Sequence, residues 1–117
     1  MTLETLREYC LSKPAVTEEF PFDNETLVFK VSGKIFLLTS VTDENLHFNV
    51  KCNPENAIEQ RELYDFVQPG FHQNKKHWNT VTYSGTNSKI LYQLIDDSYH
   101  LVVDGLPKKI RAELNAK

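Results

Sequence analysis

The stretch TLVFKVSGKIFLLTSV, residues 26–41, decides the fold of this chain. Apolar side chains alternate through residues 26–31, which is typical of a strand with one buried face. Ser32-Gly33 then predicts a tight turn. The apolar run within residues 34–41 is long enough for a second strand, buried on much of both faces. Residues 46–50 alternate again after a polar turn, so we expect a three-stranded antiparallel meander with one apolar face.

Helical patterns lie on both sides of these strands. Apolar residues recur at helical spacing in residues 2–12, and Pro14 ends that pattern. Asn53-Pro54-Glu55 predicts the start of a helix that runs to about Tyr64, because Asn caps a helix and Pro suits its first position. A wide apolar stripe predicts the longest helix over residues 88–104. We therefore predict an α+β fold, with helices packed on one face of an antiparallel sheet.

The remaining segments complete the expected order of elements. Residues 77–83 read as a strand that turns Trp78 and Val81 to opposite faces. Residues 17–22 read as an irregular connection whose two Phe rings plug one end of the core. A short basic turn, residues 108–114, ends the chain. The expected order is helix, three strands, helix, a strand or two, and long helix, within one domain of 117 residues.

The charge is unevenly distributed along the chain. The net charge is −3, with 13 Lys and Arg against 16 Asp and Glu. Residues 1–69 hold six basic and twelve acidic side chains, whereas residues 70–117 hold seven basic and four acidic ones. A protein that binds polyanions usually carries a positive surface. The basic back half is informative only if its cations cluster in space.

The location expected from the sequence is the cytoplasm. No secretion signal is recognisable in residues 1–13, and no apolar run is long enough for a membrane span. Cys10 and Cys52 are then two reduced thiols. We expect a monomer that does not interact with membranes.

The segment FHQNKKHWN, residues 71–79, is the most unusual part of the chain. Lys75 and Lys76 could neutralise phosphates, and Trp78 could stack on a base. The alternative is a polar loop that its Trp anchors in the core, which is the commoner role for a Trp at a strand start. With the basic turn near the C-terminus, the candidate nucleic-acid-binding residues are His72, Asn74, Lys75, Lys76, His77, Trp78, Lys108, Lys109 and Arg111.

Signatures of catalysis and of cofactor binding are missing from the sequence. There is no nucleophile elbow, no glycine-rich phosphate loop and no established metal-ligand spacing. Cys52 directly precedes the Asn53 cap, a position that can activate a thiol, although a buried and inert thiol is commoner. We expect no catalytic residue, no metal and no cofactor.

Several motifs in their order along the chain resemble the MmcQ/YjbR-like family. They are Pro21-Phe22, FKVSGKIF at residues 29–36, KCNPE at residues 51–55, PGFHQNKKHWNTV at residues 69–81, SYHLV at residues 98–102 and LPKK at residues 106–109. The resemblance implies a fold similar to that of the bacterial frataxin-like (CyaY-like) proteins. It also implies a proposed role in DNA binding through a "double wing" arrangement, and it supplies no catalytic residues.

Three functions therefore remain open. The first is DNA binding, mainly through phosphate contacts from the basic loop and the C-terminal turn. The second is a non-catalytic module for a small molecule or a protein partner, which requires a concave site beside residues 71–79. The third is a frataxin-like metal handler, which only the resemblance in fold supports.

Overall fold

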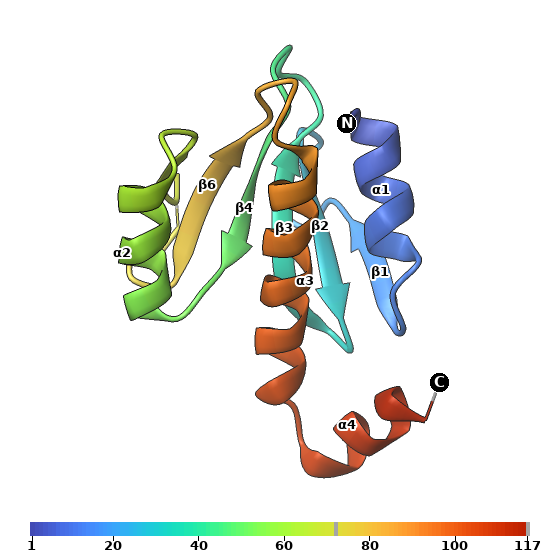
Figure 1. Ribbon diagram of the computed structural model, residues 1–117. Coiled ribbons are helices and arrows are strands. Elements are labelled where there is room, and N and C mark those ends of the chain that lie inside the picture. The colour runs from blue at the N-terminus through green and yellow to red at the C-terminus, as the bar shows by residue number, and fades with distance from the viewer. Residues whose placement is uncertain (72, 117) are drawn as a thin grey trace.

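The computed structural model describes residues 1–71 and 73–116, and its strands form one antiparallel sheet (Figure 1). The sheet has six strands in the order β1-β2-β3-β4-β6-β5. The strands are β1 (Val16–Glu19), β2 (Thr26–Val31), β3 (Lys34–Ser40), β4 (His47–Lys51), β5 (Val67–Pro69) and β6 (Trp78–Thr82). The helices are α1 (Leu3–Leu11), α2 (Pro54–Leu63), α3 (Ser88–Asp104) and α4 (Lys108–Asn115).

Helices α1, α2 and α3 cover one face of the sheet, which confirms the predicted α+β class (Figure 1). α3 packs against β3 and β4 at the centre, α1 lies over β1, and α2 lies over β5 and β6. α4 follows the C-terminal end of α3 and lies beyond the sheet. Within the described residues, no helix is both long and apolar enough to cross a membrane.

The predicted meander forms, and its register fixes which side chains meet the helices. Ser32 and Gly33 both adopt positive φ, at 48° and 84°, as the tight turn between β2 and β3 requires. A bulge after Phe29 then shifts the pairing of β2 with β3. Leu27 and Phe29 point to the helix side, whereas Val28 points to the other face. Both faces of β3 are therefore buried, as its apolar run predicts.

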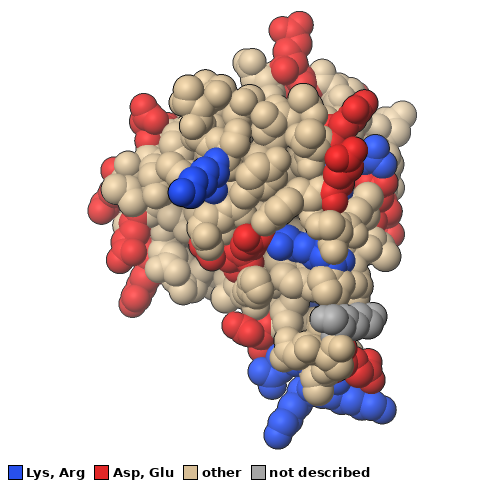
Figure 2. Space-filling view, turned by 45° about the vertical axis from the view of Figure 1, so that its right-hand side comes forward, with Lys and Arg blue, Asp and Glu red and all other residues tan. Residues whose placement is uncertain are grey.

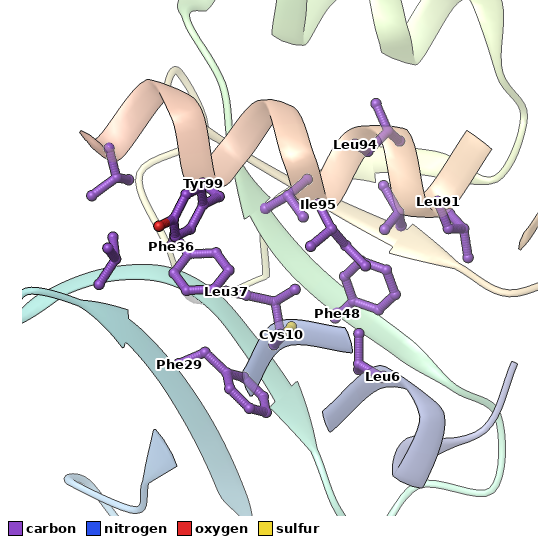
Figure 3. Close-up of a cluster of buried hydrophobic side chains, with 14 of the residues drawn as sticks. Leu6, Cys10, Phe29, Phe36, Leu37, Phe48, Leu91, Leu94, Ile95 and Tyr99 are labelled. Carbon is purple, nitrogen blue, oxygen red and sulfur yellow. The ribbon is translucent and has the colours of Figure 1, made fainter. Parts of the chain in front are cut away.

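The core lies between α3 and the sheet, and α1 closes one side (Figure 3). Ile95 and Tyr99 of α3 face Phe36 and Leu37 of β3, and the rings of Tyr99 and Phe36 meet edge to face with centroids 5.5 Å apart. Cys10 reaches the same core from α1 and is fully buried. Burial of this apolar surface supplies most of the stabilisation of the fold.

Side-chain caps begin the first two helices. The Thr2 hydroxyl accepts a hydrogen bond from the Thr5 backbone N–H at 3.1 Å, and the Thr2 backbone N–H donates to the Thr5 hydroxyl at 2.8 Å, which forms a capping box. Asn53 accepts from the Asn56 N–H at 2.9 Å, and Pro54 occupies the first helical position. The predicted start of the second helix is therefore confirmed.

Three local expectations were wrong. Residues 17–22 are not wholly irregular, because β1 pairs with β2 and adds an edge strand. Their rings do not plug the core, since Phe20 is 47% exposed and Phe22 is 66% exposed. The basic segment near the C-terminus is a regular helix, α4, and not a short turn. β1 has four residues, two of them Glu, so its sequence has little of the apolar alternation that predicts a strand. It becomes a strand because it pairs with β2.

A candidate ligand site on the open face of the sheet

A concave site of about 650 Å³ opens on the face of the sheet that α1, α2 and α3 leave uncovered. Its walls come from β2, β3, β4 and from the loops before β2, before β4 and before β6. The volume lies in the ordinary range for small-molecule sites. The lining residues are Phe22, Asp23, Thr26, Leu38, Thr39, Ser40, Asp43, His47, Asn49, Phe71 and Gln73.

The floor of this site has an apolar part and a polar part. Leu38 belongs to a small second core cluster on this face, with Val28 and Trp78. Beside it, Asn49 is nearly buried at 9% exposure. Its Oδ1 accepts a hydrogen bond of 2.5 Å from the Thr80 hydroxyl, and its Nδ2 donates to the Phe71 carbonyl oxygen at 2.9 Å. An amide Nδ2 has two hydrogens, and among the described residues only the Phe71 carbonyl accepts from the Nδ2 of Asn49.

One wall carries a carboxylate and imidazole pair. Asp43 Oδ2 lies 2.5 Å from His47 Nε2, so the carboxylate orients the ring. The His47 side chain is 29% exposed and the Asp43 side chain 52% exposed. The cross-strand register places His47 next to Asn49 on the same face of β4, because alternate residues of a strand share a face. The pair can therefore present polar atoms to a ligand that lies above Asn49.

The rim holds two exposed aromatic rings. Phe22 is 66% exposed and Phe71 is 52% exposed, and both line the site. Phe71 is held by its backbone, since its N–H donates to the Thr80 hydroxyl at 3.0 Å. Asp23, next to Phe22, accepts hydrogen bonds from the Glu25 and Thr26 N–H groups at 2.9 and 2.7 Å. These bonds lower the pKa of the Asp23 carboxyl and keep it ionised.

The charge of the lining residues is negative. Asp23 and Asp43 contribute carboxylates, and none of the described lining residues is Lys or Arg. Beside these carboxylates, the described lining residues offer a phosphate group no positive charge other than that of a protonated His47, which is already paired with Asp43. The site is therefore electrostatically unsuited to a polyanion.

Phe71 and Gln73 of the predicted nucleic-acid segment line this site, and several of the described residues of the segment are hydrogen-bonded within the fold. Lys75 Nζ donates to the Gly70 carbonyl oxygen at 3.0 Å. Arg61 of α2 donates to the Lys75 carbonyl and, from Nε, to Asn79 Oδ1 at 2.7 Å. Asn79, in turn, donates to the Ala57 carbonyl at 3.1 Å. The loop is thereby tied to α2 and to β6.

The other candidates in this segment differ in exposure. Asn74 Oδ1 accepts from the Lys76 N–H at 2.9 Å, and both side chains are exposed. His77 is exposed, and its carbonyl accepts from the Cys52 N–H at 2.8 Å. Trp78 is buried against Val28 and Leu38 at 9% exposure, so its ring cannot stack on a base without leaving that cluster. His72 lies outside the described residues.

The basic residues of the C-terminal segment lie elsewhere. Figure 2 shows Lys and Arg side chains gathered over α4 at the lower end of the molecule. Lys108 and Lys109 are exposed, and Arg111 is half-buried, with an Nε atom that has no hydrogen-bond partner within residues 1–71 and 73–116. The loop before β6 lies near α2, whereas α4 lies beyond the end of α3 (Figure 1). The fold therefore does not merge the two basic segments into one patch.

Both cysteines are buried, free thiols. Burial raises the pKa of Cys10 to about 12 and that of Cys52 to about 11. The desolvation of Cys52 outweighs the nearby charge of Arg61 and its place before α2. Cys52 is therefore buried, and its pKa is raised and not lowered. Within residues 1–71 and 73–116, no group of three or more His, Cys, Asp or Glu side chains could hold a metal ion.

Reasoning from sequence missed several residues of the concave site. Asp43, His47 and Asn49 were not singled out, since each looks like an ordinary turn or strand residue. One signal was present, because the polar residues His47 and Asn49 occupy the positions of β4 that alternate with Phe48 and Val50. Only the pairing of β4 with β3 and β6 shows what those positions face.

Comparison with known proteins agrees with this architecture. Residues 11–101 match the YjbR family. The chain belongs to the YjbR family. The resemblance predicted from the sequence is therefore confirmed at the level of the family. Neither the family description nor the names of the relatives given below refer to a reaction.

Two relatives of this YjbR-family chain are uncharacterized proteins. YbdF of Escherichia coli O157:H7 is 41% identical over 108 residues, which cover 91% of this chain and 88% of YbdF. YjbR of Escherichia coli K12 is 33% identical over 113 residues, which cover 95% of each chain. Family membership is thus shown across almost the whole length of the chain.

Two crystal structures share the fold. The Deinococcus radiodurans protein DR2400, described as a DUF419 domain, superposes with a TM-score of 0.90 at 41% identity. That match covers 97% of this chain and 88% of DR2400. A Pseudomonas syringae protein superposes with a TM-score of 0.74 at 23% identity, covering 86% of this chain and 98% of the other, and shows the fold alone.

Proposed function

We propose that this chain is a binding module without catalytic activity, and that its ligand occupies the concave site on the open face of the sheet. The observation that carries the proposal is the site itself, about 650 Å³ in volume, with a buried amide in its floor and two exposed Phe rings at its rim. Such sites combine apolar walls with a few fixed polar groups, as this one does. It lies beside residues 71–79, where the second hypothesis requires a concave site.

The polar groups of the site support binding better than a reaction. The Thr80 hydroxyl donates a hydrogen bond to Asn49, and both side chains are hydrogen-bonded to the backbone of Phe71. His47 is paired with Asp43, and the Ser40 and Thr42 hydroxyl oxygens are hydrogen-bonded to each other at 3.2 Å. Each group is fixed by a neighbour, which suits recognition of a ligand that fits their arrangement.

Amide chemical shifts during a fragment screen test this function. The expected result is that binding fragments perturb the backbone amides of the lining residues, above all on β3 and β4. A Ser40→Phe variant should lose these perturbations, because its ring fills the site from β3. A Ser84→Phe variant, at an exposed position outside the site, is the matched control. Perturbations confined to other surfaces would overturn the proposal.

DNA binding is the second candidate, and the basic side chains over α4 favour it (Figure 2). Contacts from Lys108, Lys109 and Arg111 to phosphates would give an affinity that falls steeply as salt rises. Fluorescence anisotropy of a labelled duplex across a salt series tests this. A Lys108→Glu/Lys109→Glu variant should lose binding, with Lys75→Glu/Lys76→Glu as the comparison that reports the loop. Absence of binding at low salt would remove the candidate.

We also propose that the chain is a monomer in the cytoplasm. The two free, buried thiols support a reducing compartment, since neither takes part in a disulfide. Sedimentation of the purified chain at several concentrations tests the monomer, and a mass that rises with concentration would contradict it.

A further inference from the structure

We propose that the ligand of the concave site is a small, flat aromatic or heteroaromatic molecule that carries N–H donors and no negative charge. This inference rests on the proposed function, because it names the chemical class that the same site accepts. The rings, the charge and the hydrogen-bonding groups of the site all favour this class of ligand.

The two rings at the rim favour a flat partner. Phe22 and Phe71 lie on separate loops, and both are more than half exposed although they are large and apolar. The lining also includes Leu38, which is only 6% exposed. An aromatic ligand above Leu38 removes apolar surface of the rings from water and gains edge or face contacts with them. A flexible polar ligand would leave these rings exposed.

The charge of the site excludes anions. Asp23 is held ionised by two backbone N–H groups, and Asp43 lies in the connection between β3 and β4 with half of its side chain exposed. Among the described lining residues there is no Lys or Arg to offset them. A neutral ligand avoids repulsion, and a cationic one gains attraction that salt weakens.

The polar groups of the site are mainly hydrogen-bond acceptors, so they favour a ligand that carries donors. A carboxylate only accepts hydrogen bonds, and the hydroxyls of Thr26 and Ser40 add further acceptor sites beside it. The second Nδ2 hydrogen of Asn49, for which the described residues supply no acceptor, would suit a single acceptor atom on the ligand. A heterocycle with N–H or amino groups at its edge and one ring acceptor matches this pattern.

Calorimetric titration with two matched pairs of probes tests the class. Tryptamine and indole-3-propionate share a ring and differ in the sign of their charge, and adenosine and its 5′-monophosphate differ by a phosphate. We expect tryptamine to bind about tenfold more tightly than indole-3-propionate at low salt, and adenosine about tenfold more tightly than the monophosphate. The preference should shrink as salt rises.

Matched variants locate the effect in the site. Phe22→Ala should weaken adenosine binding about tenfold, whereas Phe20→Ala should not, because Phe20 is similarly exposed but lines a different surface. Asp43→Asn should reduce the preference for tryptamine, whereas Glu44→Gln makes the same change of charge on the next residue, outside the site.

The outcomes separate this inference from the proposed function. Tighter binding of the anionic member of each pair would overturn the ligand class. If neither pair binds but other fragments still perturb the amides of β3 and β4, the ligand class is wrong and the binding site stands. If no fragment perturbs those amides, the proposed function and the ligand class are both wrong.

Discussion

Asn49 donates a hydrogen bond of 2.9 Å from Nδ2 to the carbonyl oxygen of Phe71, which ties the floor of the concave site to its rim. The two residues are 22 positions apart and lie on β4 and on the loop before β6. Thr80 completes the link, since its hydroxyl donates to Asn49 and accepts from the Phe71 N–H. The position of an exposed ring thus depends on a buried amide.

Replacing Asn49 should loosen this rim and destabilise the fold. Asn49→Ala leaves the Phe71 carbonyl without its donor and the Thr80 hydroxyl without its acceptor, at a cost of about 2 kcal/mol in the free energy of unfolding. Urea denaturation measures this cost. Asn56→Ala, whose side chain is exposed on α2, should change stability by less than about 0.5 kcal/mol. Equal effects would show that the network contributes nothing.

Gly70 should not tolerate a side chain. Its N–H donates to the Trp78 carbonyl at 2.9 Å, and a Cβ added there would lie 2.8 Å from the Trp78 Cβ. Gly70→Ala should therefore cost about 1–3 kcal/mol, as overpacking does. Gly105→Ala is the control, because its nearest neighbour, the Val102 carbonyl, lies 3.5 Å away. A neutral Gly70→Ala would mean that β6 can shift at little cost.

Asp96 should hold α1 to α3. Its Oδ1 accepts hydrogen bonds of 2.6 Å from both Lys13 Nζ and the Tyr9 hydroxyl. The Lys13 side chain is only 14% exposed, so Asp96→Ala leaves its charge without a partner. This should lower the free energy of unfolding by about 2 kcal/mol. The adjacent Asp97→Ala removes an exposed carboxylate and should cost less than about 0.5 kcal/mol. Urea midpoints of the two variants provide the comparison, and a similar loss in both would count against the buried pair.

The free energy of unfolding should fall as the pH rises above about 9. Burial raises the pKa of Cys10 from 9.0 to about 12, so below pH 9 the thiol is protonated in both states and has no effect. Between pH 9 and 12 only the unfolded state ionises, which lowers the free energy of unfolding by about 1.4 kcal/mol per pH unit. Cys10→Ala should make the decline of the urea midpoint between pH 8.5 and 10.5 less steep, because the Cys10 contribution is removed. An unchanged slope would show that Cys10 does not cause it.

The thiols should also resist modification in the native state. Cys10 is fully buried and Cys52 is 6% exposed, and burial raises both pKa values. Ellman's reagent at pH 8 should therefore label neither residue until urea unfolds the chain. Rapid labelling of Cys52 in native buffer would instead indicate that the segment before α2 opens readily.

Much of the fold follows from local patterns. The alternation in β2 and β4, the turn at Ser32-Gly33 and the cap at Asn53 were all predicted, because each depends on neighbours within a few residues. β1 was not predicted, since its pairing with β2 and not its own pattern makes it a strand. The candidate site was predicted only as a place beside residues 71–79, without its floor residues.

The sequence by itself determined the class of fold, the faces of β2 and β4 that meet the helices, and membership in the YjbR family. Periodicity and turn chemistry act over short range, so the chain carries them wherever it folds. The tertiary structure decided that Trp78 is buried and Phe22 exposed, and that Asp43, Asn49 and Phe71 border one cavity. Those facts depend on strand order and loop paths, which long-range pairing sets and no local pattern encodes.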